Sequence, residues 1–492
     1  MPFECEYFRY LREEMLYSHI CVRLYCSFHS ERHSRASVCE TSRDTDSHAF
    51  LFVSMCQRGE ADGKMGIMIK RPEVLMQRTL HPVGQGAFYT EQLLYNQADF
   101  KDSVLYNVVY DCGSFNRNLL HKKIDYAFPV TSKVDILFIS HFDEDHINGI
   151  DYLSKRVKRI KCCVMPLLSP AQKIIVFLNC KVDLFNIRAF KQNYNIEKII
   201  EIDRVNPADN RSRPLSPNEP QNNNENRPIK VVDNNGKKEL EVIRSGTPLG
   251  VGLIPKWCYI PFNICDDSEY EGFEKFLQIT DPALFNSLKD LIKIYGKEYS
   301  EKESDNLFAD WVEIKGRLKP VYDVYIKENS ETLSNRNDSS LIVYSGPVND
   351  NVSGRNSDCF VKSITKERDL SQSNWHKVRR DKLVAALYTG DINLNKIIGS
   401  ETTCRFLFKE LKGLAENLGL IQVPHHGSKH NFSTDLTEEF PKVPNYFYSF
   451  GLTNSYGHPF PGIRVWLYYD KRRVFEVTED ADTKLTQIIE IY

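Results

Sequence analysis

The residues best suited to chemistry lie in one short segment, His141-Phe142-Asp143-Glu144-Asp145-His146. Two imidazoles and two carboxylates in it bind hard or borderline divalent cations, and it contains no soft sulfur ligand. These side chains are His141, Asp143, Asp145 and His146. Carboxylates and imidazoles this close together repel one another or lack binding partners unless a cation binds between them. The segment therefore predicts a metal site. The alternative is an acid-rich turn whose histidines only cap or hydrogen-bond.

The flanking residues predict a strand before this segment and a helix after it. Residues 134–140 are mostly β-branched and apolar, which is typical of a buried strand. Residues 147–153 have the pattern of an amphipathic helix start, and the positive end of that helix dipole favours carboxylates beside it. The polar side chains are therefore expected at the carboxyl end of a rigid strand, where open sheets gather ligand sites.

Later in the chain the same order of apolar strand and polar turn recurs. The three instances are residues 383–389 before Gly390-Asp391, residues 420–423 before His425-His426, and residues 446–450 before Asn454 and His458. Because such turns gather at one edge of a sheet, we expect their side chains to converge with the first segment. The apolar face of residues 403–418 predicts a helix between the first two of these strands.

The composition is that of an ordinary globular protein without a strong overall charge. The 492 residues are 41% hydrophobic, and 64 Lys and Arg against 66 Asp and Glu give a net charge of -2. This balance excludes a general attraction to nucleic acid or membranes, so any polyanion site is local. No apolar run approaches the roughly 20 residues of a membrane helix, and the first residues lack an apolar signal core. Thirteen cysteines without regular spacing favour reduced thiols, and we expect a cytoplasmic protein.

Changes in pattern divide the chain into segments. Residues 1–68 are rich in Ser, Arg, His and Cys without a sustained period, which predicts a poorly ordered extension or a true start at a later methionine. Residues 74–492 form the expected main domain. Within it, residues 206–230 predict a flexible loop, and residues 268–330 have the periodicity of a helical insertion that could bind a protein partner. The alternative for the insertion is a separate domain with its own function.

These motifs, taken in order, resemble the metallo-β-lactamase superfamily, and more closely the soluble hydrolase domain of ComEC-type DNA-uptake proteins. The seven matching motifs are V-G-Q-G, D-C-G, S-H-F-D-E-D-H-I-N-G, N-D-S-S-L, T-G-D, P-H-H-G-S and Y-G-H-P, spread from Val83 to Pro459. The resemblance covers residues 74–492 apart from the insertion. It implies an α/β (α+β) fold, an αββα sandwich with a helical insertion, which holds one or two metal ions on such turns.

The resemblance also implies roles for individual residues. The implied metal ligands are His141, Asp143, Asp145, His146, Asp391, His425 and His426, with Asp391 bridging two ions and His425 preferred over His426. The implied catalytic residues are Asp145, His146 and Asp391. The candidates for substrate binding are Ser428, Lys429, Asn454, His458, Arg379 and Arg380, of which the basic residues could contact phosphates or simply form a solvated face. The expected supporting polar residues are Gln85, Asp111 and Asn337.

Two departures from the family pattern bear on the number of metal ions. The central motif is H-x-D-x-D-H, in which Asp143 replaces a histidine of the commoner H-x-H-x-D-H. The histidine of the third family motif is also missing, because His376, in a basic segment, is the only histidine between His146 and Asp391. Occupancy by one ion or by two therefore stays open.

The chemistry that this ligand set suggests is hydrolysis by a metal-bound hydroxide. Two cations about 3.5 to 4 Å apart lower the pKa of a shared water and clamp the attacking and leaving oxygens, which suits a phosphodiester or nucleic-acid substrate. The carboxylate-rich set favours Mn²⁺ as well as Zn²⁺. Two alternatives remain. One is a hydrolase of an ester, lactone or thioester with the same metals and a different pocket. The other is a metal-binding interaction module with vestigial activity.

Overall fold

The computed structural model describes most of the chain from Val74 onward. The described residues are 74–95, 104–130, 132–180, 182, 184, 187–205, 229–230, 240–251, 254–264, 268–295, 301–329, 340–347, 359–366 and 382–492. The predictions for residues 1–68, residues 206–228, Asn337, Arg379 and Arg380 lie outside this part of the chain.

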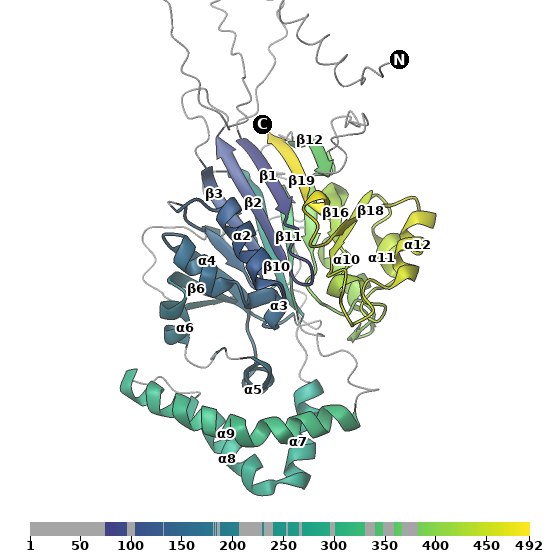
Figure 1. Cartoon of the computed structure of the whole chain (residues 1–492). Helices are drawn as coiled ribbons and strands as arrows, with labels where there is room; N and C mark the ends of the chain where they lie inside the picture. The colour runs from purple at the N-terminus through teal and green to yellow at the C-terminus, as the bar shows by residue number, and fades with distance from the viewer. Residues whose placement is uncertain are drawn as a thin grey trace, which may run out of the picture. The chain divides into compact units, whose positions relative to one another are not determined.

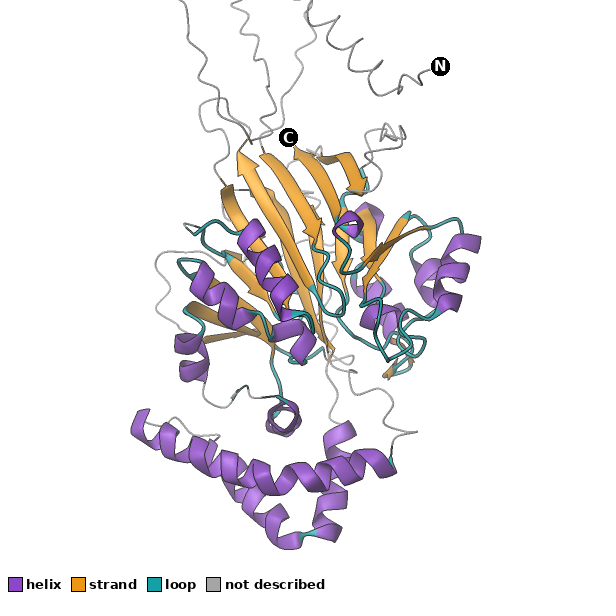
Figure 2. Ribbon diagram, in the orientation of Figure 1, coloured by secondary structure: helices purple, strands orange, loops and turns teal. Residues whose placement is uncertain are grey.

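Two large sheets form the centre of the described chain (Figures 1 and 2). The first contains, in spatial order, β12 (Cys359–Lys366), β19 (Leu485–Ile491), β1 (Val74–Leu80), β2 (Phe88–Tyr95), β3 (Val104–Cys112), β4 (Ile136–Phe138), β5 (Ile160–Pro166), β6 (Ile196–Ile202) and β8 (Leu240–Ile243). The second contains β18 (Arg473–Val477), β17 (Asn445–Ser449), β16 (Leu418–Gln422), β13 (Ala385–Tyr388), β11 (Ser340–Pro347), β10 (Ile254–Ile264), β9 (Leu249–Val251) and β7 (Ile229–Lys230). A short ribbon pairs β14 (Ile397–Ile398) with β15 (Glu401–Thr402).

Both sheets contain a run of parallel strands, and these runs supply the polar turns. The strands β3, β4, β5, β6 and β8 are parallel in the first sheet, and β13, β16, β17 and β18 are parallel in the second. Strand β4 is buried along its whole length, as its unbroken apolar sequence requires. Parallel strands in one sheet end at the same edge, so the turns after β3 and β4, and those after β13 and β16, lie together.

Helices cover the outer faces of both sheets (Figure 1). On the first sheet lie α2 (Arg117–Ala127), α3 (Glu144–Ile147), α4 (Ile150–Arg156) and α6 (Ile187–Asn193), and on the second lie α10 (Thr403–Glu410), α11 (Asp435–Glu439) and α12 (Pro461–Tyr469). Helix α5 (Pro170–Asn179) lies below the sandwich, toward the insertion. One buried core lies between the sheets, a second under the helices of the first sheet and a third under those of the second. The predicted αββα sandwich is therefore confirmed.

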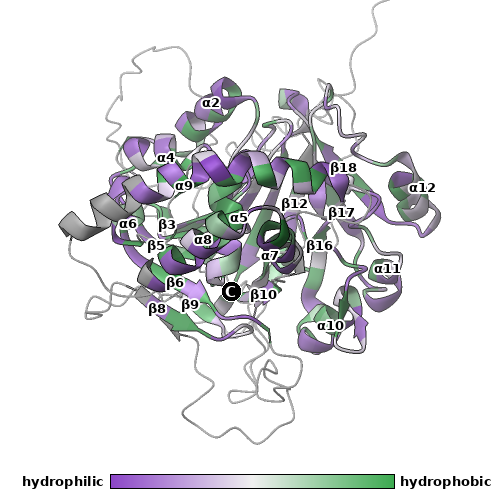
Figure 3. Ribbon diagram, turned by 90° about the horizontal axis from the view of Figure 1, so that it is seen from below, coloured by the Kyte–Doolittle hydropathy of each residue, from purple (hydrophilic) through white to green (hydrophobic). Residues whose placement is uncertain are grey.

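The helical insertion is present as three helices. These are α7 (Ser268–Thr280), α8 (Pro282–Tyr295) and α9 (Glu301–Glu328), and hydrophobic and hydrophilic residues alternate along α9 (Figure 3). Buried Phe273, Leu288 and Trp311 share one core with Phe177 of α5. Lys315 of α9 donates to the carbonyl of Cys180 at 2.7 Å, and its ammonium lies 4.6 Å from the centre of the Phe177 ring. The insertion thus packs directly on the sandwich through α5.

Two local predictions differ from the structure. The helix expected over residues 403–418 ends at Glu410, because Gly413 adopts φ +90°, a left-handed conformation that an α-helix does not contain. The loop expected over residues 206–230 ends in strand β7, whose residues Ile229–Lys230 pair with β9. Among the described helices, none combines the length and the apolar sequence needed to span a membrane.

A buried ion pair lies between the two sheets. Arg78 of β1 and Glu91 of β2 approach to 2.6 Å, and their side chains are only 1% and 3% exposed. The Glu91 carboxylate also accepts hydrogen bonds from Tyr388, Tyr259 and Ser345 at 2.7 to 2.8 Å, all on the opposite sheet. Burial opposes the charge of Arg78, but Glu91 outweighs this effect and raises the pKa of the guanidinium. This network ties the sheets together across an otherwise apolar core.

Candidate metal centre

The histidine-rich loop after β4 packs closely against two glycines. A Cβ on Gly113 would lie 2.4 Å from the carbonyl oxygen of Asp145, and one on Gly86, at φ +138°, would lie 2.7 Å from the same atom. The backbone N–H of Ala87 donates to that carbonyl at 3.2 Å. The glycines of V-G-Q-G and D-C-G are therefore needed because a larger residue would push the loop out of position.

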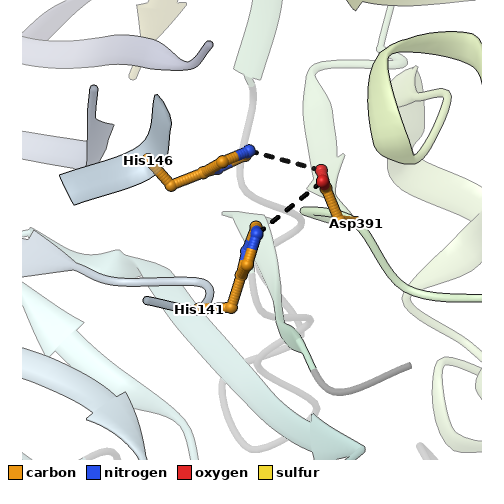
Figure 4. A group of neighbouring side chains, drawn as sticks. All are labelled: His141, His146 and Asp391. Atoms are coloured by element: carbon orange, nitrogen blue, oxygen red, sulfur yellow. Dashed lines mark ion pairs between the residues drawn. The ribbon is translucent and has the colours of Figure 1, made fainter. Parts of the chain in front are cut away.

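His141, His146 and Asp391 form the first group of potential ligands (Figure 4). His141 and Asp391 each lie three residues beyond the end of a strand, β4 in one sheet and β13 in the other. Both imidazoles point toward the Asp391 carboxylate, with Nε2 to Oδ2 at 3.7 Å for His141 and Nε2 to Oδ1 at 3.4 Å for His146. The group therefore joins the two sheets at their shared polar edge.

Asp145, His146 and His426 form a second group that shares His146 with the first. Nε2 of His426 lies 3.2 Å from Oδ2 of Asp145, and Nε2 of His425 lies 3.7 Å from Oδ2 of Asp391. His425 and His426 have φ values of +50° and +54°, which are uncommon for residues other than glycine. This strained turn directs both imidazoles toward the carboxylates.

The Nδ1 atoms of His146, His426 and His141 each contact a neighbouring polar group. Nδ1 of His146 donates to the Asp111 carboxylate at 2.8 Å, and Nδ1 of His426 donates to the carbonyl of Ser449 at 2.7 Å. Nδ1 of His141 lies 2.9 Å from the hydroxyl of Ser140, which itself donates to Asp111. Partners that hold Nδ1 in this way leave Nε2 available and fix the ring orientation, as in known metal sites.

Three of the Nε2 atoms are buried without a hydrogen-bond partner among the described residues. They belong to His141, His146 and His426. A buried polar atom left unpaired costs roughly 1 to 3 kcal/mol, so three that converge on the same carboxylates require a further partner. Imidazole nitrogens and carboxylate oxygens are ligands of Zn²⁺ and Mn²⁺. The residues present thus fit a divalent cation.

The electrostatics of the site agree with this donor set. Burial alone would raise the pKa of Asp391, but the imidazoles of His146, His425 and His141 hold it well below its usual value. Burial likewise opposes the charge of His146, but Asp391 and Asp111 raise its pKa well above the ordinary value. The carboxylates therefore make this a place where positive charge is stabilised.

Other residues predicted for the site lie around the two groups. Asp143 precedes α3 with a side chain 47% exposed, and its Oδ2 lies 3.8 Å from Nε2 of His141. The His458 ring lies 5.0 Å from that of His425, and burial together with His425 and His426 lowers the pKa of His458 to about 4. His458 is therefore neutral at pH 7 and borders the site. His81, which the sequence did not suggest as a ligand, is buried against Thr90 at 2.9 Å.

The predicted substrate-binding residues have different environments. Ser428 is buried, and its hydroxyl accepts from the N–H of His430 at 3.3 Å. Lys429 is exposed, with its ammonium 5.2 Å from the centre of the Phe460 ring. The Asn454 amide donates to the carbonyls of Gly451 and His458 at 2.6 Å, so it orders its own loop.

Three residues that the sequence did not suggest support the ligands. The Asn431 amide donates to the carbonyl of Asp391 at 2.8 Å, and its oxygen lies 3.0 Å from Nδ1 of His425. The Ser340 hydroxyl accepts from the N–H of Asp391, and Ser140 links His141 to Asp111. Ser140 and Ser340 stand inside the quoted motifs, and Asn431 follows P-H-H-G-S-K-H directly. Their position in or beside the motifs is the feature of the sequence that could have identified them as supporting residues.

Comparison with known proteins finds similar solved structures, all those described here at low sequence identity. No protein-family model matches the sequence, and no curated protein does. The chain is similar to the metallo-β-lactamase fold protein YhfI from Bacillus subtilis at 9% identity and TM-score 0.31, over 82% of this chain and 97% of that one. It is similar to a long form RNase Z from yeast at 11% identity and TM-score 0.29, over 86% of this chain and 43% of that one. Such scores carry no argument about chemistry, so what can be said of this site rests on its own geometry.

Proposed function

We propose that the protein is a metal-dependent hydrolase that acts on a phosphodiester. The observation that carries the proposal is the convergence of three buried Nε2 atoms on the Asp391 and Asp145 carboxylates without a hydrogen-bond partner among the described residues. Motifs from Val83 to Pro459, which resemble the hydrolase domain of ComEC-type proteins, agree with it. Three aspartates beside the histidines favour an oxygen-preferring cation such as Mn²⁺ as well as Zn²⁺.

In this proposal His141, His146 and Asp391 hold one cation, and Asp145, His146 and His426 hold a second where two are bound. When bound, such cations make water more acidic and polarise the phosphoryl oxygens. The chain's own residues orient the ligands, since Asp111 holds His146 and the Ser449 carbonyl holds His426. Exposed Lys429, two residues after the turn His425–Gly427, is suited to contact a phosphate.

Metal content and a substrate panel test the proposal. The full chain should contain Zn²⁺ or Mn²⁺, lose it to a chelator and regain it on reloading. Hydrolysis of bis(p-nitrophenyl) phosphate should be lost and regained with the metal, and p-nitrophenyl acetate and a simple lactone should react more slowly. Turnover of the ester or lactone alone would establish the alternative, a hydrolase of an ester, lactone or thioester. Stable metal binding without any turnover would establish an interaction module.

Replacing Asp111 by asparagine should weaken metal binding without removing a ligand. Asp111 contacts Nδ1 of His146 and the backbone and hydroxyl of Ser140, so its loss frees the His146 ring to rotate or change tautomer. Loss of such a partner typically costs 10- to 100-fold in metal affinity or activity. Competition with a chromophoric chelator measures the affinity. Asp125→Asn, on the outer helix α2, is the matched control, and an affinity loss equal in both variants would contradict the positioning role.

A further inference from the structure

A polar cavity of about 630 Å³ lies among loops that also carry motifs of the candidate metal centre, and its lining contains none of the candidate ligands. Three segments line it, the V-G-Q-G turn, residues 115–118 at the start of α2, and residues 451–456, together with Glu479. Hydrogen bonds through Gln85 join these loops, because its carbonyl accepts from the N–H of Phe115 at 3.0 Å and its side chain accepts from the N–H of Gly451 at 3.3 Å. The volume is within the range of small-molecule sites, roughly 300 to 1,000 Å³. The cavity is therefore a built feature of the fold, defined here as the Phe115–Tyr456 groove.

Two exposed aromatic rings face each other in this groove. Phe115 and Tyr456 are 50% and 60% exposed, and their rings are stacked with centroids 6.3 Å apart and planes 26° apart. Although the rings stack on each other, each keeps half or more of its surface exposed, so apolar area remains for a ligand to cover. The rings come from different loops, so they present aromatic faces to whatever enters the cavity.

The row of rings continues from the groove to the metal centre. Tyr456 stacks on His458 at 6.2 Å, and the His458 ring lies 5.0 Å from that of His425, which faces Asp391. On another side, the guanidinium of Arg117 in the groove pairs with Glu144, the neighbour of Asp145 in the loop of ligands. The groove is thus connected to the candidate metal centre through His458 and His425 on one path and through Arg117 and Glu144 on another.

The polar lining indicates which part of a ligand the groove receives. Its two charged side chains already have partners: Arg117 pairs with Glu144, and the Glu479 carboxylate accepts from the N–H of Leu452 at 3.0 Å. The remaining lining is uncharged amide, hydroxyl and backbone, from residues such as Asn118, Thr453 and Ser455. Flat aromatic faces with uncharged donors and acceptors match a neutral planar ring that carries hydrogen-bonding edges.

We propose that the Phe115–Tyr456 groove binds a base of single-stranded nucleic acid, stacked on these two rings, and thereby presents the adjoining phosphodiester to the metal centre. This inference rests on the proposed function for the chemistry at the centre, but base binding in the groove is measurable without it. Stacking of a base on an aromatic side chain contributes roughly 1 to 3 kcal/mol by alanine substitution and tolerates any base, since every base has a π-face.

Binding to two matched strands tests the proposal. The full chain is kept in excess chelator, so that no strand is cleaved. Fluorescence anisotropy measures its affinity for two labelled strands. One is an oligothymidylate, and the other has the same backbone with every base replaced by an abasic tetrahydrofuran unit. Phe115→Ala and Tyr456→Ala should each weaken binding of the base-bearing strand by roughly 5- to 150-fold. The affinity for the base-free strand should not change.

Two further variants make the test specific. Tyr456→Phe keeps the aromatic face and should restore most of the affinity. Tyr468→Ala removes a ring that is 76% exposed on α12, away from the groove, and should have no effect. Equal affinity of the wild-type chain for both strands would overturn the proposal, as would equal weakening of both strands by Phe115→Ala.

Base binding in the groove and hydrolysis at the metal centre can be tested separately. Preferential, groove-dependent binding of the base-bearing strand by a chain that hydrolyses nothing after metal reloading would support the groove and refute the hydrolase. Metal-dependent hydrolysis of small phosphodiesters by a chain that binds both strands equally would do the reverse.

Discussion

Asparagine in place of Asp391 is expected to abolish metal-dependent hydrolysis while the fold persists. Asp391 faces His141, His146 and His425 at 3.4 to 3.7 Å and belongs to the first group of potential ligands. Its backbone contacts with Ser340 and Asn431 do not involve the carboxylate and should survive the substitution. Charge stabilisation by a bound cation contributes several kcal/mol to the transition state, so kcat/KM should fall by about a thousandfold or more.

Metal analysis and circular dichroism distinguish loss of the site from loss of the fold. Asp391→Asn should retain less than the wild-type metal content after gel filtration and keep an unchanged far-UV spectrum. Asp482→Asn, an exposed carboxylate of the 3₁₀ turn at Ala481–Thr483, is the control and should behave as wild type. A variant Asp391→Asn with full metal content and full rate would refute the ligand assignment.

Alanine in place of Glu91 is expected to destabilise the sandwich by roughly 3 to 5 kcal/mol, because it leaves the buried charge of Arg78 without its partner. The hydroxyls of Tyr259, Ser345 and Tyr388 lose their acceptor in the same step. The remaining contacts of Arg78, with the Val384 carbonyl and Gln487, carry no negative charge and do not replace the carboxylate. Urea denaturation followed by intrinsic fluorescence measures the change in the free energy of unfolding.

An exposed ion pair of the same chain serves as the control. Asp151 and Lys155 pair at 2.6 Å with side chains 58% and 71% exposed, and Asp151→Ala should cost no more than about 1 kcal/mol. The double variant Arg78→Met with Glu91→Leu should be less destabilised than Glu91→Ala, because it leaves no unpaired charge in the core. Equal costs for Glu91→Ala and Asp151→Ala would show that the buried network contributes little to stability.

Local sequence was sufficient to predict the strands and turns that carry the candidate ligands. The apolar run of residues 134–140 contains the buried strand Ile136–Phe138, and the polar residues after it lie at the edge of the sheet. Apolar periodicity likewise predicted the helices of the insertion, whereas the αββα class was predicted from the motifs that resemble the metallo-β-lactamase superfamily. The break at Gly413 was missed because an apolar period does not reveal a left-handed backbone.

Tertiary structure alone decided how each side chain is used. The sequence presents Asp143, Asp145 and Asp391 all as metal ligands, yet Asp143 is half-exposed beside the two groups that contain the others. It does not show that the amide of Asn454, predicted to contact substrate, donates to the carbonyls of Gly451 and His458. The Asp111–His146 contact joins residues 35 positions apart, and the Glu91–Tyr388 contact joins residues 297 positions apart. Spacing along the chain carries no information about such contacts, because they depend on how two sheets pack and not on local conformation.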